Sequence, residues 1–150
     1  MPTNLTKTLR LPLRILAILL VVAVAWLVRS RAVALLPIDY DEDDYLRAGQ
    51  EYAALVRAGD WAGFLETNYR PEHPPLDKIV FGLAVLTQPE TALVPDRPTT
   101  AGPASSLPPG QLRAARTTSA VAGPLEVLLL ALVDPLGALF LGIHTFTIKY

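Results

Sequence analysis

A run of fourteen apolar residues without a charge, at 15–28, constrains the fold more than any other feature of the chain. A run of this kind indicates a membrane-spanning helix. Fourteen residues rise only about 21 Å, whereas the hydrocarbon core of a bilayer is about 30 Å thick, so the helix must extend beyond the run at both ends. We therefore predict a transmembrane helix at 11–30.

The flanks of this helix predict its depth and direction. Arg14 and Arg29 are expected to bury their stems in lipid and to reach the headgroups with their guanidinium groups, and Trp26 suits the interface. Three bases precede the helix and two follow it closely, which by a narrow margin favours a cytoplasmic location for residues 1–10.

The same stretch has a competing interpretation as a secretory signal peptide. It has a basic start, an apolar middle and small residues at 32–34 that resemble a cleavage site. Arg29 and Arg31 directly follow the apolar run, which suits a retained anchor better than a cleavage region. A protein released by cleavage would also still carry two later apolar segments that need lipid.

Those two segments predict further membrane helices. The first, 111–133, is long enough to cross a bilayer, with Pro124 tolerated as a kink. After a break at Asp134-Pro135, residues 136–150 begin a third transmembrane helix that we expect to be truncated where the sequence ends. The composition agrees, since 51% of the residues are hydrophobic and only 18% are charged. We predict a mainly α, multi-pass protein of the cell membrane, formed by the N-terminal part of a polytopic helix bundle.

A polar segment, 31–110, separates the first two membrane helices and is expected to be a helical extracytoplasmic loop. Its acidic part, 31–78, holds ten acids and five bases. Apolar residues recur at three- and four-residue steps in 43–58, which predicts an amphipathic helix, and a second short helix is expected at 76–87. The proline-rich stretch 88–110 predicts a flexible, extended linker.

An acidic cluster near the start of this loop is the first candidate site. Asp41 and Glu42 form a carboxylate pair that can act as a general base toward a hydroxyl, or stabilise positive charge on a sugar or a metal ion. Asp41-x-Asp43 also has the shape of a divalent-metal motif. The structural alternative is an acidic helix start at which Asp41 or Asp43 caps backbone N–H groups. Capping explains one or two of the five acids, so both interpretations stay open.

Glu72-His73-Pro74-Pro75 is the second candidate. The two prolines hold His73 on a rigid backbone, which suits a hydrogen bond to a phosphate or a substrate hydroxyl, although a loop histidine can also simply be solvated. In the later apolar segments, Glu126 is an ionisable group at membrane depth with either a functional or a structural role. His144 suits a hydrogen bond between helices.

Composition excludes several other classes. A net charge of -1 leaves no basic surplus for binding nucleic acid. The absence of cysteine excludes disulfides and thiolate metal sites. The sequence also contains no glycine-rich phosphate loop, no histidine pair with metal-binding spacing, no nucleophile elbow and no internal repeat.

Three motifs in order carry a resemblance to a known family: Asp41-Glu42-x-x-Tyr45, Gly59-Asp60-Trp61 and Glu72-His73-Pro74-Pro75-Leu76-x-Lys78. They resemble the first extracytoplasmic loop of the C-type glycosyltransferases, particularly glycosyltransferase family 39 and the dolichyl-phosphate-mannose protein mannosyltransferases. The resemblance covers about residues 11–150, the N-terminal part of such an enzyme. It implies a mannosyltransferase-like enzyme that moves a sugar from a polyprenyl-phosphate carrier to an acceptor on the outer face of the membrane, usually with inversion.

The resemblance also implies roles for single residues. Asp41 would be the catalytic base that takes the acceptor proton, and Glu42 its neighbour in the same site. Binding of the substrate or the lipid phosphate would fall to His73, Lys78, Tyr45 and Glu72. The expected partners are a polyprenyl-phosphate-linked sugar and membrane lipid, with no nucleic acid and an unidentified acceptor. No cofactor is implied, and a divalent metal on Asp41 and Asp43 stays an alternative.

Function classes other than an enzyme fit the same sequence. One is a small, non-catalytic, membrane-anchored interaction protein whose acidic loop is a binding surface, or an inactive product of a truncated gene. Another is a periplasmic protein released by cleavage near Ala34.

Overall fold

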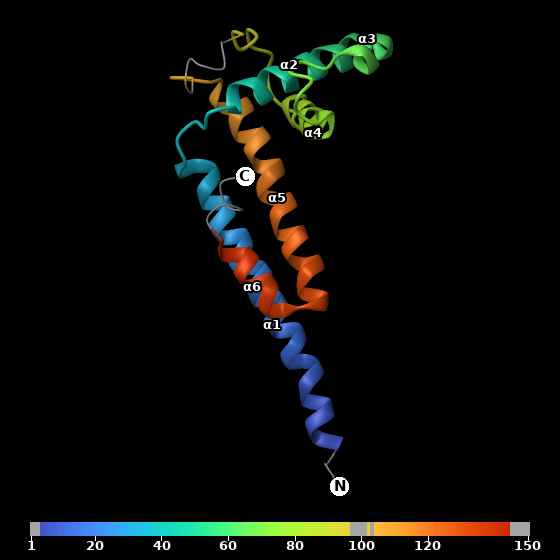
Figure 1. Ribbon diagram of the computed structural model, residues 1–150, viewed down its shortest axis with the longest axis vertical. Coiled ribbons are helices and arrows are strands. Elements are labelled where there is room, and N and C mark those ends of the chain that lie inside the picture. Colours follow the sequence, from blue (N-terminus) through green and yellow to red (C-terminus); the bar gives the residue numbers. More distant parts are fainter. Residues whose placement is uncertain (1–3, 97–101, 103, 145–150) are drawn as a thin grey trace. The chain divides into compact units, whose positions relative to one another are not determined.

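The computed structural model describes residues 4–96, 102 and 104–144, and this part of the chain is mainly helical, without strands (Figure 1). The helices are α1 (Asn4–Leu35), α2 (Glu42–Ala58), α3 (Trp61–Glu66), α4 (Pro75–Val85), α5 (Pro109–Val133) and α6 (Pro135–Ile143). They form two compact units. The described residues of 1–36 and 119–150 form one, which we call the apolar unit, and those of 37–118 form the other, the loop unit.

The apolar unit is built on helices suited to lipid. Within the described residues, two helices are long and apolar enough to cross a membrane, α1 over Leu11–Leu35 and α5 over Pro109–Val133. In this unit α1 packs against α6, and the core consists of Ile18, Val21, Ala25, Val127, Ala131 and Ala138. Three of the six are alanines, which let helices approach closely, as is common between membrane helices.

The predicted membrane helices differ from the observed ones mainly at their ends. The first extends beyond the predicted 11–30 and stops at Leu35, because Pro37 disfavours helical geometry in the residue before it. The second starts at Pro109, two residues before the predicted start, since proline suits a first helical turn. Pro124 lies inside this helix. Of the predicted third helix, α6 accounts for the residues up to Ile143, and 145–150 lie outside the described residues.

Arg29 does not reach out of the unit as predicted. Only 3% of the residue is exposed, and its Nη1 donates to the backbone carbonyl of Gly142 in α6 at 3.1 Å. Arg14 is also tied to a neighbouring helix, because its Nη2 donates to the carbonyl of Leu132 in α5 at 2.5 Å. In this unit the Arg29 side chain is therefore buried between helices and connects α1 to α6.

Helix α2 is the centre of the loop unit and agrees with the predicted 43–58 to within one residue. Buried residues recur along one side, at Leu46, Ala48, Gly49, Tyr52 and Ala53. The helix ends at Gly59, which has a φ of 69° and donates its N–H to the carbonyls of Leu55 and Val56. Glycine adopts this left-handed conformation without the steric cost that a side chain would add.

Helix α4 packs on α2 at a pair of glycines. A Cβ on Gly82 would lie 2.8 Å from the Cβ of Tyr52, and a Cβ on Gly49 would lie 3.2 Å from the backbone nitrogen of Gly82. The two backbones therefore come closer together than larger residues would allow. The surrounding core consists of Leu46, Ala53, Val85, Val94 and Ala115. The helix ends at Val85, two residues before the predicted end at 87.

The described start of the proline-rich stretch, 88–96, packs on the helices instead of forming the flexible linker that we predicted. Val94 is 3% exposed, and its N–H donates to Oε1 of Gln50 at 2.7 Å. Nε2 of Gln50 lies 2.8 Å from Oε1 of Gln111 in α5 and 3.1 Å from Oγ1 of Thr91. These buried amides fix the segment to α2 and α5. Residues 97–101 and 103 of the predicted linker lie outside the described part.

Candidate functional site

Asp41 stands at the N-terminus of α2, but its carboxylate accepts no capping hydrogen bond from the helix. Neighbouring acids bind the local backbone instead. Oδ1 of Asp43 accepts the N–H of Asp44 at 3.0 Å, and Oε2 of Glu42 accepts the N–H of Asp39 at 2.8 Å. Of the two acids predicted to cap backbone groups, Asp43 therefore does so and Asp41 does not.

The surroundings of Asp41 make its carboxylate more basic. Burial raises the pKa of Asp41 above its ordinary value. Its own backbone N–H opposes this rise, as does the nearby His73, while the negative charges of Asp39 and Glu42 add to it. A carboxylate with a raised pKa holds a proton more firmly once it has taken one, which is the property of a general base.

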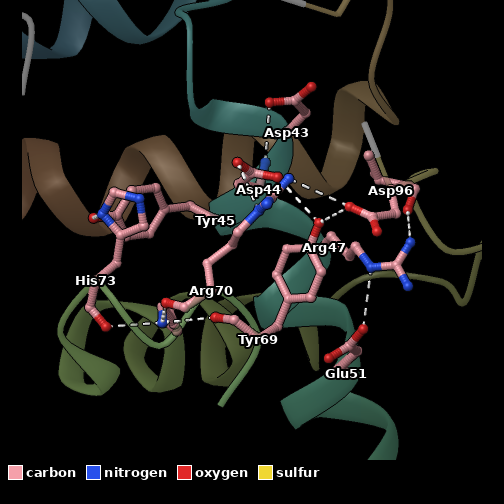
Figure 2. A network of polar contacts seen from close by, with 11 residues as sticks. Asp43, Asp44, Tyr45, Arg47, Glu51, Tyr69, Arg70, His73 and Asp96 are labelled. Carbon is pink, nitrogen blue, oxygen red and sulfur yellow. Dashed lines mark hydrogen bonds and ion pairs between the residues drawn. The ribbon is translucent and has the colours of Figure 1, made fainter. Parts of the chain in front are cut away.

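Tyr45 and His73, 28 residues apart in the sequence, lie together (Figure 2), and Asp41 is near enough to interact electrostatically with both. Oη of Tyr45 lies 3.2 Å from Nδ1 of His73, and the two ring centroids are 5.2 Å apart. Burial raises the pKa of Tyr45, and the charges of Asp41 and Asp77 raise it further, so the hydroxyl stays protonated. When His73 carries its proton on Nε2, its Nδ1 accepts the tyrosine hydrogen and Nε2–H remains as a donor.

Lys78 holds the loop that carries His73. The residue is 1% exposed, and its Nζ lies 2.9 Å from Oδ1 of Asn68 and 2.7, 2.6 and 2.8 Å from the carbonyl oxygens of Tyr69, Arg70 and His73. Burial lowers the pKa of Lys78, and the charge of Glu72 opposes that effect. An ammonium group has three hydrogens for these four oxygens. The prediction that Lys78 binds a phosphate is therefore wrong: its donors are used inside the fold.

A polar cluster that the sequence analysis missed lies beside this loop (Figure 2). The guanidinium of Arg70 pairs with Asp44 through Nε and with Asp96 through Nη2, each at 3.3 Å. Oη of Tyr69 lies 3.1 Å from Oδ1 of Asp44 and 2.5 Å from Oδ1 of Asp96. Arg47 covers the Tyr69 ring at 4.9 Å from its centroid. This cluster joins α2, the His73 loop and the 88–96 segment.

Glu42 is held by an arginine from the other end of the loop unit. Its Oε1 and Oε2 each accept a hydrogen bond from Arg116 in α5 at 2.6 Å. This two-point geometry is the strongest form of an arginine–carboxylate pair. The prediction that Glu42 works beside Asp41 as a catalytic group is corrected accordingly, because both of its carboxylate oxygens are bonded to Arg116, which suits a positioning role. The two residues are 74 positions apart, so their opposite charges were the only sign of this pair in the sequence.

The remaining predicted residues take no part in a recognisable metal centre. Glu72 is exposed on the surface of the loop. Asp43 is 5% exposed and binds the neighbouring amide, so it does not share a cation with Asp41 in this arrangement. Within the described part of the chain, no group of three or more histidine, aspartate or glutamate side chains is placed to hold a metal ion.

The loop unit also has a cavity of about 390 Å³ that lies away from these residues. Its lining includes Gln50, Glu51, Arg57, Thr67 and Glu90 and none of the predicted site residues. Asp41, Tyr45 and His73 do not line this cavity.

No family model, no curated protein and no solved structure matches the chain.

Proposed function

We propose that the chain is part of a membrane glycosyltransferase that moves a sugar from a polyprenyl-phosphate carrier to an acceptor on the outer face of the membrane. The observation that supports this proposal is the contact of Tyr45 with His73, together with the electrostatic interaction of both with Asp41; the sequence motifs single out these residues separately. A general base and a hydrogen-bonding imidazole at one place are the groups that the reaction needs from this part of the enzyme. The proposed placement is a multi-pass membrane protein with the loop unit outside the cytoplasm.

In the proposed reaction, Asp41 removes the proton of the acceptor hydroxyl. The acceptor oxygen then forms a bond to the anomeric carbon of the sugar, the bond from that carbon to the phosphate oxygen breaks, and the lipid phosphate leaves with the electron pair. The configuration at the anomeric carbon inverts. A carboxylate with a raised pKa suits the first step. Nε2–H of His73 can donate to the phosphate or to a sugar hydroxyl, which stabilises charge in the transition state.

In this proposal the other residues position the site. The Arg116 pair fixes Glu42 and with it the start of α2, which carries Asp41. Lys78 fixes the backbone of the loop at His73. Each therefore acts through another residue.

The test is transfer of a sugar from a synthetic polyprenyl-phosphate sugar by the protein in proteoliposomes. Replacing the base, Asp41→Asn, should lower the rate at least about 100-fold, the usual contribution of a general base. Glu66→Gln changes an exposed carboxylate of the same unit and serves as the matched control, with an unchanged rate. Near-normal transfer by Asp41→Asn would remove this residue from the reaction.

A non-catalytic interaction protein is the second candidate, and it is favoured by the structural roles of Glu42 and Lys78. Two of the residues expected to handle substrate are occupied within the fold. In that case the exposed acids of the loop would bind a basic partner, and no polyprenyl-phosphate sugar would be consumed. The same proteoliposome assay separates the two functions, provided that a panel of sugar donors is used.

A further inference from the structure

The guanidinium of Arg29 in the apolar unit has one edge that forms no hydrogen bond. Its Nη1 donates to the carbonyl of Gly142, whereas Nε and Nη2 are buried and have no hydrogen-bond partner. The N–H of Nε and one N–H of Nη2 point in the same direction. Together they form the fork that binds a carboxylate or a phosphate through two parallel hydrogen bonds.

The residues around Arg29 explain where the two edges of its guanidinium group lie. Gly142 lies in the last turn of α6, where backbone carbonyls have no partner inside the helix, so Nη1 completes the end of that helix. On α5, Gly123 leaves the space that the guanidinium fills, because a Cβ at this position would overlap Nε of Arg29. A glycine backbone, without a side chain in the way, therefore borders the fork.

Among the residues that the structure describes, no anion is bound to the fork. Glu126, three residues after Gly123 on α5, is close enough to act on Arg29 electrostatically, but it bonds neither Nε nor Nη2. Its side chain is exposed. A buried charged donor without a hydrogen-bond partner costs more free energy than a buried neutral donor does. Binding of an external anion would remove this cost and is therefore favourable here.

We propose that the fork of Arg29 binds the phosphate group of a lipid. This inference rests on the membrane placement in the proposed function, but not on sugar transfer. Arg29 lies six residues before the end of α1 at Leu35, a rise of about 9 Å. Trp26, one turn earlier, is 46% exposed and suits the interface. A spanning α1 would therefore hold the fork near the level of the headgroup phosphates.

The test uses the full chain with ¹⁵N-labelled arginine in dodecyl maltoside micelles, titrated with dodecyl phosphate. The Nε–H signal of Arg29 should move downfield and saturate, and Arg29→Gln should lose the signal and weaken binding about tenfold or more. Arg31→Gln, an exposed arginine of the same helix, is the matched control and should bind as the unaltered chain does. The signal of the unaltered chain reports on the site even where Arg29→Gln fails to fold.

Two further arms identify the source of the anion. Inorganic phosphate should leave the Arg29 signal in place, and saturation by it at similar concentrations would overturn the assignment to a lipid. An Nε–H signal that ignores dodecyl phosphate but moves in Glu126→Gln would show an internal ion pair and overturn the whole proposal. Binding that persists while Asp41→Asn and the unaltered chain both lack transferase activity would leave this site standing and the enzyme proposal refuted.

Discussion

Replacing Lys78 by methionine tests whether the His73 loop depends on this one ammonium group. Methionine keeps the length and apolar contacts of the stem, and it leaves three partly buried carbonyl oxygens, of Tyr69, Arg70 and His73, without their donor. A buried acceptor without a partner costs about 1–3 kcal/mol. Three carbonyls at the lower end of this range lower the free energy of unfolding of the loop unit by about 3 kcal/mol.

Urea unfolding of the full chain in detergent micelles measures this change, with Trp26→Phe so that Trp61 of α3 reports on the loop unit. Arg113→Gln, an exposed cation on α5, is the control and should change little. Hydrogen exchange gives an independent readout, because the N–H of His73 donates to the carbonyl of Arg70 at 3.0 Å and should lose its protection in Lys78→Met. A change below about 0.5 kcal/mol with full protection at His73 would refute the role given to Lys78.

Four other substitutions probe the surroundings of the site. Glu42→Gln removes the charge that Arg116 binds at two points and should lower the stability of the loop unit by about 2 kcal/mol in thermal unfolding, with Arg116→Gln acting alike. Gly82→Ala should cost about 1–3 kcal/mol, because the added methyl group meets Tyr52, and unchanged stability would contradict the close helix contact. Because the folded pKa of Asp41 is raised, the native state loses stability as pH rises from the ordinary carboxyl range through that pKa. Asp41→Asn should remove this loss in a pH series of unfolding free energies.

The helices of the loop unit could be predicted because local sequence marks them. The three- and four-residue spacing predicted α2 to within one residue, and Gly59 and Pro75 mark boundaries by backbone properties of their own. That α1 and α5 are long and apolar enough to cross a membrane follows from their length and apolar content alone. The sequence did not predict which face of α2 is most deeply buried, because this face is determined by the glycine contact with α4.

The polar contacts of the site were much harder to predict. Lys78 binds mainly backbone carbonyls. Every residue has a carbonyl group, so the residue types do not indicate which carbonyls point toward Lys78. Glu42 and Arg116 are far apart in the sequence, so their pairing requires the fold first. The packed 88–96 segment was predicted to be a linker because prolines and polar residues dominate it. A single buried valine, Val94, does not form a pattern that predicts packing.

The acids at the start of α2 divide according to what surrounds them, and this division bears on function. Glu42 and Asp44 have arginine partners, and Asp43 binds a backbone amide, so each stabilises the fold. Asp41 is partly buried among like charges, which raises its pKa and costs stability at neutral pH. Substitution should therefore act with opposite signs: Asp44→Asn lowers the stability of the loop unit, whereas Asp41→Asn raises it while lowering the transfer rate at least about 100-fold. A destabilising effect of Asp41→Asn at neutral pH would mean that this carboxylate serves the fold, and the main reason for placing the chemistry there would be lost.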